Sequence, residues 1–375
     1  MTGDGARTLV RAELRDFRNY ERAEFELSPA LTVVCGANGA GKTNLLEAAY
    51  FGCTGRSCRT SNQRELVRFG TKVARVAVDV AAGDGEHRIE VGFEPGELRR
   101  LRVDGANVDR LADSPVRPLA AVFLPDRLEL VKGAPALRRS HLDQLVAALW
   151  PARAKTAAAY GRAVGQRNAL LARVRAGHAS RDLLDPWDAE LARIGAELMH
   201  DRAAAADLLA APFARIAAEL GLDGVLELAY RPRSRAREAE KLRRELLEQR
   251  DTDLNRGFSG HGPHRDDLGL SRDGRALRTY GSQGQQRIAL LALLFAEREV
   301  LRAERGTAPL MLLDDVMSEL DERRRGRLVE LLADGGQALI TATERAHVPA
   351  DDALWLEVAD GVIAAEGAAK PRLVA

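Results

Sequence analysis

Residues 36–43 read Gly-Ala-Asn-Gly-Ala-Gly-Lys-Thr, which fits the pattern G-x-x-x-x-G-K-[ST]. A largely apolar run at residues 31–35 precedes this stretch and predicts a buried strand, and residues 44–51 have the apolar spacing of a helix. Small residues at such a turn let backbone amides surround phosphate groups, and the helix N-terminus adds a partial positive charge. The stretch therefore predicts a phosphate-binding loop (a Walker A loop) in an α/β fold, and its context disfavours a glycine-rich turn that binds nothing.

The loop also indicates which ligand it binds. Lys42 would reach the β and γ phosphates of ATP, and the Thr43 hydroxyl would ligate Mg²⁺. ATP and magnesium are therefore the predicted cofactors. The candidate nucleotide-binding residues are Gly36, Ala37, Asn38, Gly39, Ala40, Gly41, Lys42 and Thr43.

A second motif, which ends in two acidic residues, lies far along the chain. Four apolar residues at 310–313 are followed by Asp314 and Asp315. This pattern places Asp314 at the carboxyl end of a buried strand, beside the phosphate loop, where a Walker B acid holds the magnesium shell. An apolar run that ends in two acids is common by itself. Its value comes from the pairing with residues 36–43, which predicts Thr43 and Asp314 as the metal-binding side chains.

Composition limits the class of protein. The 375 residues are 46% hydrophobic and 30% charged, typical of a globular chain, and 56 basic residues against 55 acidic ones give a net charge of +1. That balance excludes binding of nucleic acid through gross charge but permits a local basic face. The nine-residue apolar run at 288–296 is shorter than the roughly 20 residues of a membrane helix. With no apolar leader and three unpaired cysteines, the sequence predicts a soluble, cytoplasmic protein that does not associate with membranes.

The strand and helix patterns along the chain predict two domains. Closely spaced strand patterns at 73–80, 87–93 and 98–103 indicate an antiparallel β layer attached to the first α/β unit. From about residue 136 the sequence turns to helical spacing, with proline at 151 and 186 as possible helix starts; strand patterns return at 268–270 and 276–280. We therefore expect a discontinuous α/β domain over 1–135 and 257–375, interrupted at 136–256 by a mostly helical lobe that forms a short coiled-coil-like arm.

Two further motifs point to a superfamily. Residues 281–287, Gly-Ser-Gln-Gly-Gln-Gln-Arg, resemble the S-G-G-Q signature of ATP-binding-cassette (ABC) ATPases, and residues 318–321 resemble their S-x-L-D loop at the dimer interface. The four motifs occur in the superfamily's order, although a Ser/Gly/Gln cluster alone is usually a solvated helix cap. The resemblance implies that Ser282 and Gly284 contact the γ-phosphate of ATP held by a second subunit.

Within that superfamily the chain is most similar to the RecF family of bacterial recombination mediators, which are relatives of the SMC heads. The resemblance covers most of the chain. The segments that carry it, besides the four motifs, are residues 17–20 (FRNY), 44–48 (NLLEA), 54–57 with 59–60 (TGRS and RT), 123–133 (FLPDRLELVKG) with 138–139 and 142–143, and 262–267 (GPHRDD).

Some positions depart from the ABC pattern. Transporter cassettes carry glutamate after the Walker B acid as the base that polarises water, whereas this chain has the shorter Asp315, which suits slow hydrolysis. The expected catalytic residues are accordingly Asp315, Asp314 and Lys42. Residues 342–344 replace the switch histidine, so Thr341 or Thr343 is a candidate for part of its role.

The resemblance implies a mechanism and partners. An ATPase head of this kind dimerises on ATP, clamps double-stranded DNA at single-strand gaps, and releases it on slow, DNA-stimulated hydrolysis. With RecR and RecO it would help to load RecA, and it would support DNA repair, replication restart and the SOS response. Two rival classes stay open: an ATP-gated scaffold whose hydrolysis is incidental, and a transporter-type ABC subunit.

The residues that would contact DNA remain open in the sequence. Seven basic residues cluster between Arg231 and Arg244, but neighbouring glutamates dilute them, so a solvated face and a phosphate-binding face are equally good interpretations. Arg56 and Arg59, after the predicted phosphate-loop helix, could sense phosphate or DNA.

Overall fold

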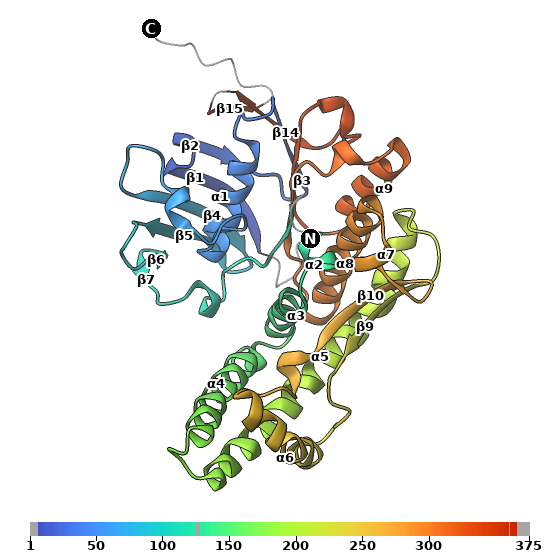
Figure 1. Cartoon of the computed structure of the whole chain (residues 1–375). Coiled ribbons are helices and arrows are strands. Elements are labelled where there is room, and N and C mark those ends of the chain that lie inside the picture. Colours follow the sequence, from blue (N-terminus) through green and yellow to red (C-terminus); the bar gives the residue numbers. More distant parts are fainter. Residues whose placement is uncertain (1–6, 125–127, 360, 366–375) are drawn as a thin grey trace. The chain divides into compact units, whose positions relative to one another are not determined.

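The computed structural model describes residues 7–124, 128–359 and 361–365, and the chain forms two compact units (Figure 1). The first unit contains residues 1–127 and 301–375, and the second contains residues 128–300. Three residues of the segment 123–133, Pro125 to Arg127, lie outside the described residues, as do residues 366–375 of the tail. Within the described ranges, no helix is long and apolar enough to cross a membrane.

A mainly parallel sheet forms the centre of the first unit. All of its strands run parallel except the edge strand β15, which pairs antiparallel with β14. The central strands are buried, as expected for parallel strands covered on both faces. In spatial order the strands are β15 (Val362–Ala365), β14 (Leu354–Ala359), β3 (Leu31–Cys35), β13 (Ala338–Ala342), β12 (Leu310–Leu313) and β8 (Ala120–Phe123).

An antiparallel sheet is the second layer of this unit. Its strands alternate buried and exposed side chains, so one face joins the core and the other faces solvent. Helix α1 (Lys42–Thr54) packs on the core face, where a Cβ at Gly52 would lie 2.4 Å from the Val78 side chain. The strands are β2 (Tyr20–Glu26), β1 (Thr8–Phe17), β4 (Ala74–Ala82), β5 (Gly85–Phe93), β6 (Arg100–Val103) and β7 (Ala106–Asn107). The predicted α/β head with an antiparallel layer is confirmed.

The second unit is mostly helical. Helix α5 (Asp185–Glu219) is the longest, and Pro186 lies in its first turn, where a proline needs no backbone donor. A small sheet of β11 (Arg275–Ala276), β10 (Asp267–Arg272) and β9 (Leu226–Arg231) completes the unit. The other helices are α2 (Glu129–Lys132), α3 (Pro135–Leu149), α4 (Thr156–Arg175), α6 (Ala239–Arg256), α7 (Leu277–Tyr280) and α8 (Gln283–Arg305), whose last residues enter the first unit.

One more helix and several short 3₁₀ turns complete the described structure. Helix α9 (Glu322–Ala333) belongs to the first unit, and Asp321 caps its N-terminus by accepting a hydrogen bond from the Arg324 amide at 2.9 Å. The 3₁₀ turns are Gln63–Leu66, Leu111–Asp113, Pro151–Arg153, Arg181–Leu184, Pro263–Arg265, Met317–Glu319 and Arg345–His347.

The second unit is held by buried arginines. Arg167, which is fully buried, donates hydrogen bonds to Asp188 and Asp253, both at 2.6 Å, and to the Ser259 hydroxyl at 2.8 Å. The segment 259–267 receives similar contacts, since Arg138 binds Asp267 at 2.7 and 3.0 Å. Its GPHRDD residues (262–267) also contact α4, where Tyr160 lies 3.1 Å from His264, and α5, from which Arg202 donates to the Pro263 carbonyl at 2.8 Å.

Three sequence predictions differ from the structure. The contacts place the domain boundaries at 127/128 and 300/301 rather than at 135/136 and 256/257; the second shifts because β10 pairs with β9 and carries residues 267–272 into the helical unit. The strand expected at 276–280 is mainly helix α7: Gly281 donates to the Leu277 carbonyl at 3.0 Å and closes a helical turn. The helix expected to open at Pro151 begins at Thr156, after a 3₁₀ turn.

Candidate nucleotide-binding site

The predicted phosphate loop connects β3 to α1 in a conformation that requires glycine. Gly36, Gly39 and Gly41 have φ values of +155°, +83° and +114°, a region that other residues rarely adopt. A Cβ at Gly36 would lie 2.2 Å from the Val358 carbonyl oxygen, so the backbone could not pass there with a side chain. The loop is therefore a tight turn whose end, at Gly41, begins helix α1.

Lys42 points back across this loop. Its Nζ donates to the Gly36 carbonyl at 2.8 Å and to the Ala37 carbonyl at 3.0 Å, and the residue is only 7% exposed. No carboxylate within the described ranges forms an ion pair with it. A buried ammonium that is bound only by neutral carbonyls keeps its positive charge available to an anion in the loop.

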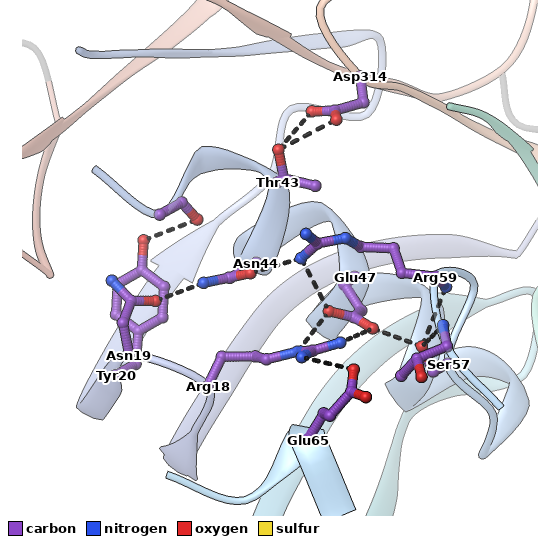
Figure 2. Close-up of polar contacts among 12 residues, drawn as sticks. Arg18, Asn19, Tyr20, Thr43, Asn44, Glu47, Ser57, Arg59, Glu65 and Asp314 are labelled. Atoms are coloured by element: carbon purple, nitrogen blue, oxygen red, sulfur yellow. Dashed lines mark hydrogen bonds and ion pairs between the residues drawn. The ribbon is translucent and has the colours of Figure 1, made fainter. Parts of the chain in front are cut away.

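Thr43 joins the loop to the predicted acidic strand end. Its hydroxyl lies 2.8 and 3.0 Å from the two carboxylate oxygens of Asp314, which follows β12 (Figure 2). Hydroxyl and carboxylate oxygens are the ligands that Mg²⁺ prefers, so this pair fits the predicted magnesium site. The structure thus brings Asp314 to Thr43, which is 271 positions away in the sequence and directly follows Lys42.

A second threonine fixes the acidic pair. Thr341, buried at the end of β13, donates from its hydroxyl to Asp314 Oδ1 at 2.7 Å and accepts from the Asp315 amide at 2.9 Å. Asp315 itself has a left-handed backbone with φ +43°, and its buried Oδ1 has no hydrogen-bond partner among the residues that the structure describes. Thr341, rather than Thr343, is therefore the threonine that contacts both acids.

The turn between β1 and β2 supports the phosphate loop from one side. The Tyr20 hydroxyl donates to the Gly41 carbonyl at 3.2 Å (Figure 2), and Asn19 donates to the Ala40 carbonyl at 3.3 Å. Burial raises the pKa of Tyr20, which keeps this hydroxyl protonated and able to donate. The family resemblance included residues 17–20 but gave them no role. Their contact with the phosphate loop depends on the tertiary fold and is not visible in the sequence.

A buried glutamate holds the other side of α1. Glu47, which is fully buried, accepts from Arg18 at 2.8 and 2.9 Å and from the Ser57 hydroxyl, and Arg59 lies 3.4 Å away. Arg59 also donates to Asn44 at 2.8 Å, near the start of α1 (Figure 2). Arg59 is therefore held beside the loop by Glu47 and Asn44, and these contacts account for its position with no need for a ligand.

The signature residues form a separate group in the second unit. Ser282 and Gly284 are exposed at the start of α8. The Ser282 hydroxyl accepts from the Gln285 amide at 3.3 Å, and the Gln285 side chain accepts from the Ser282 amide at 3.0 Å, which is a reciprocal helix cap. Ser282 is thus both a cap and an exposed group at the positive end of a 23-residue helix.

The basic cluster at 231–244 alternates in exposure. Arg231, Arg233, Arg235 and Arg237 are exposed, while Ser234 and Ala236 between them are buried. One of its members, Arg243, lies 3.6 Å from Glu240. The cluster is therefore exposed, which fits both a solvated face and a phosphate-binding face.

Comparison with known proteins identifies the family. Residues 8–359 match the model of the RecF/RecN/SMC N terminal domain. The chain is 39% identical to the DNA replication and repair protein RecF of Frankia alni over 92% of this chain and 95% of that one, and 42% identical to that of Anaeromyxobacter sp. over 90% and 92%.

Solved structures agree with this result. A structure of the recombination mediator protein RecF with ATPrS, in the RecFOR pathway, is similar with a TM-score of 0.85 and 30% identity, covering 98% of this chain and all of that one. An SMC head from Pyrococcus furiosus has a TM-score of 0.57 at 19% identity over 96% of both chains, which shows a shared fold. The chain therefore belongs to the RecF family of DNA replication and repair proteins.

Proposed function

We propose that this chain is an ATP-dependent recombination mediator that closes as a dimer on double-stranded DNA at single-strand gaps and reopens on slow hydrolysis of ATP. The observation that carries the proposal is the contact of the distant Asp314 with Thr43, beside Lys42 in the phosphate loop. Their cationic, hydroxyl and carboxylate groups are those that a nucleoside triphosphate and its metal require. A structural relative described with ATP supports the same ligand.

Each side chain has a distinct task in this proposal. Lys42 would exchange its two carbonyl partners for phosphate oxygens, and Mg²⁺ held by Thr43 and Asp314 would neutralise charge on the phosphates. Asp315 would orient the attacking water and accept its proton, because one of its buried oxygens has no partner within the described ranges. Thr341 holds both acids in position.

Dimerisation follows from the exposed signature. Ser282 and Gly284 at the N-terminus of α8 would contact the γ-phosphate bound by a second chain, where the helix end favours negative charge. ADP lacks that phosphate, so only ATP would stabilise the closed dimer. Family membership supports a role in replication and repair, and the RecFOR pathway of the solved relative suggests RecR and RecO as partners and RecA loading as the outcome.

Fluorescence anisotropy of a labelled gapped duplex tests the proposal. We expect ATP to tighten binding, ADP and no nucleotide to leave it weak, and Ser282→Arg to abolish the gain from ATP. Ser61→Arg is the matched control, because it adds the same charge at another exposed serine and should keep the ATP response. Binding that ignores the nucleotide in the unmodified chain would refute the ATP-dependent clamp.

The shorter Asp315 favours one alternative, an ATP-gated scaffold whose hydrolysis is incidental. Asp315→Asn discriminates the two functions because it keeps the shape of the site and removes the proton acceptor. In the mediator, this variant binds DNA with ATP but fails to release it, and repair in cells is lost. Full repair without measurable hydrolysis would favour the scaffold.

A further inference from the structure

Four arginines lie in one line across the solvent face of the antiparallel sheet. Arg15 of β1 is directly opposite Arg22 of β2 on one side and Arg75 of β4 on the other. Arg75 is opposite Gly92, and Gly92 is opposite Arg100 of β6. We call Arg22, Arg15, Arg75 and Arg100 the arginine row.

The arginine row is not neutralised by the protein. All four side chains are exposed, and none of them has an ion pair within the part of the chain that the structure describes. Like charges directly opposite each other on neighbouring strands are destabilising. The sheet therefore carries an unfavourable arrangement that an anionic ligand would relieve.

The adjacent part of the same face behaves differently. Arg11 binds Glu13 at 2.9 Å and Glu24 at 2.6 Å, and Arg88 binds Glu13 and Asp79, both at 2.8 Å. These arginines are paired within the sheet. The arginine row is thus an unpaired basic line on this face, and the carboxylates that line the same hollow, Glu13, Asp16, Glu21, Glu24 and Glu90, would confine an anion to that line.

The length of the row indicates a polymer. Four steps between strands of about 4.8 Å give a span of roughly 19 Å from β2 to β6. At about 3.4 Å of helix axis for each phosphate of one strand, a nucleic-acid backbone would present five or six phosphates over that distance. A hollow of about 950 Å³ opens on this face and is lined by all four arginines. A single small anion could not contact all four, whereas one strand of a nucleic-acid backbone could.

We propose that the arginine row binds the phosphate backbone of duplex DNA, a contact surface on the first unit that is separate from the nucleotide site. Guanidinium groups suit this ligand because they bind phosphate oxygens in pairs and remain charged. The row lies on the face opposite α1, since Val76 and Val78 of the same strand contact Gly52 of that helix. The inference rests on the proposed DNA-dependent function and gives that function a surface.

Salt dependence of duplex binding, measured with ATP, tests this surface. Arg15→Gln combined with Arg75→Gln should weaken binding roughly tenfold and lower the slope of log K against log salt by about 2, since each phosphate contact contributes about 0.9. Arg11→Gln combined with Arg88→Gln is the matched control, because it removes the same charge from the same face but from paired arginines. The control should keep the slope of the unmodified chain.

Two further measurements make the result decisive. Arg15→Lys combined with Arg75→Lys keeps the charge, so duplex binding should keep its salt slope. Urea unfolding should show that the glutamine variant is as stable as the unmodified chain, because the substitution removes repulsion between arginines. If the glutamine variant and the unmodified chain have the same salt slope, the inference about the arginine row is wrong, but the proposed function is not affected. Failure of the unmodified chain to bind duplex DNA would overturn the proposed function as well.

An acidic segment of a partner protein is the competing ligand. Phe69 and Leu98, in the loops before β4 and β6, are 100% and 92% exposed and would suit a protein contact. Polyglutamate serves as the probe for this outcome. If the glutamine variant loses polyglutamate binding and keeps duplex binding and its salt slope, the row is a protein surface and the inference is wrong.

Discussion

The nucleotide site of the first unit and the buried arginines of the second unit treat charge in opposite ways. In the second unit Arg167 is enclosed by Asp188 and Asp253, so opposite charges bind each other directly. In the nucleotide site Lys42 is bound by carbonyls and Asp314 by two threonine hydroxyls. Both regions bury charge, but Lys42 has no carboxylate partner among the described residues, unlike Arg167 and unlike the nearby pair of Arg18 and Glu47.

This difference separates a structural role from a binding role. A buried ion pair has a desolvation cost that its attraction must offset, but breaking the pair costs more, because removing one partner leaves an uncompensated charge. A buried cation without a carboxylate partner is tolerated only where hydrogen bonds hold it, and it gains most from an incoming anion. Charge that the protein leaves unpaired therefore marks the places where we expect ligands, and the arginine row fits the same rule on the surface.

Breaking the buried network should have the largest effect on stability. Arg167→Met leaves Asp253 without a charged partner, while Asp188 keeps Arg250, and should lower the unfolding free energy by about 3 kcal/mol. Urea unfolding in a background that carries Trp150→Phe and Trp355→Phe, followed by the fluorescence of Trp187 on α5, measures this. Arg193→Met on the same helix is the control: its pairs with Glu190 and Glu197 are exposed to solvent, so their loss should leave the unfolding free energy nearly unchanged. Equal losses in the two variants would refute the distinction between the regions.

The matching change in the nucleotide site should act on binding instead. Lys42→Met removes a buried charge that has no carboxylate partner within the described ranges, so the unfolding free energy should change by less than about 1 kcal/mol. ATP affinity should fall about 10- to 100-fold, the value of a charge-assisted hydrogen bond. Isothermal titration calorimetry with ATP checks the affinity. A large loss of stability with unchanged ATP affinity would show that Lys42 is a structural residue.

Removal of one hydroxyl tests how the acids are positioned. Thr341→Val keeps the shape of the side chain but takes away the donor to Asp314 and the acceptor for the Asp315 amide. We expect ATP turnover to fall about tenfold and stability to fall by about 1–2 kcal/mol, as for a lost buried hydrogen bond. Thr343→Val, two residues further on, is the control for a nearby β-branched threonine and should turn over ATP normally. Comparable rates for the two variants would remove Thr341 from the site.

The sequence predicted the nucleotide site better than it predicted the charge networks. Residues 36–43 are contiguous, and Asp314 ends an apolar run, so local patterns were sufficient to find them. The helices of the second unit were also foreseeable from periodicity, although the boundary at 300/301 was not, because it depends on the pairing of β9 with β10. The DNA-repair family followed from motifs and is confirmed by the comparisons.

Arginine roles could not be predicted for a physical reason. A buried arginine such as Arg167 and an exposed one such as Arg193 occupy similar alanine- and leucine-rich helical sequence. The arginine row depends on strand register, which brings Arg15 and Arg100 into one line although 85 positions separate them. The sequence pointed instead to the dense cluster at 231–244. Clustering in sequence and alignment in space are different properties, and only a tertiary structure reveals the second.

The smallest expected effect is a pH dependence in the second unit. The Ser259 carbonyl can only accept, so His264 donates to it from Nε2 at 2.9 Å and its Nδ1 accepts from the Tyr160 hydroxyl at 3.1 Å. Burial lowers the pKa of His264, with smaller contributions from Arg265 and Arg139, and protonation would also turn the Nδ1 acceptor into a donor. The unfolded chain then binds the proton more readily than the folded chain does.

Stability of the second unit should therefore fall as the pH drops below the ordinary histidine pKa of about 6.5, by no more than about 1.4 kcal/mol for each pH unit. His264→Gln should reduce this slope between about pH 7 and pH 5.5, a range above the ordinary carboxyl values. Urea unfolding at several pH values, again with Trp187 as the probe, measures the slope, and His178→Gln at an exposed position is the control. If both variants keep the slope of the unmodified chain, protonation of His264 does not oppose folding. The buried contacts of the GPHRDD segment would then be insensitive to charge, unlike those of Arg167.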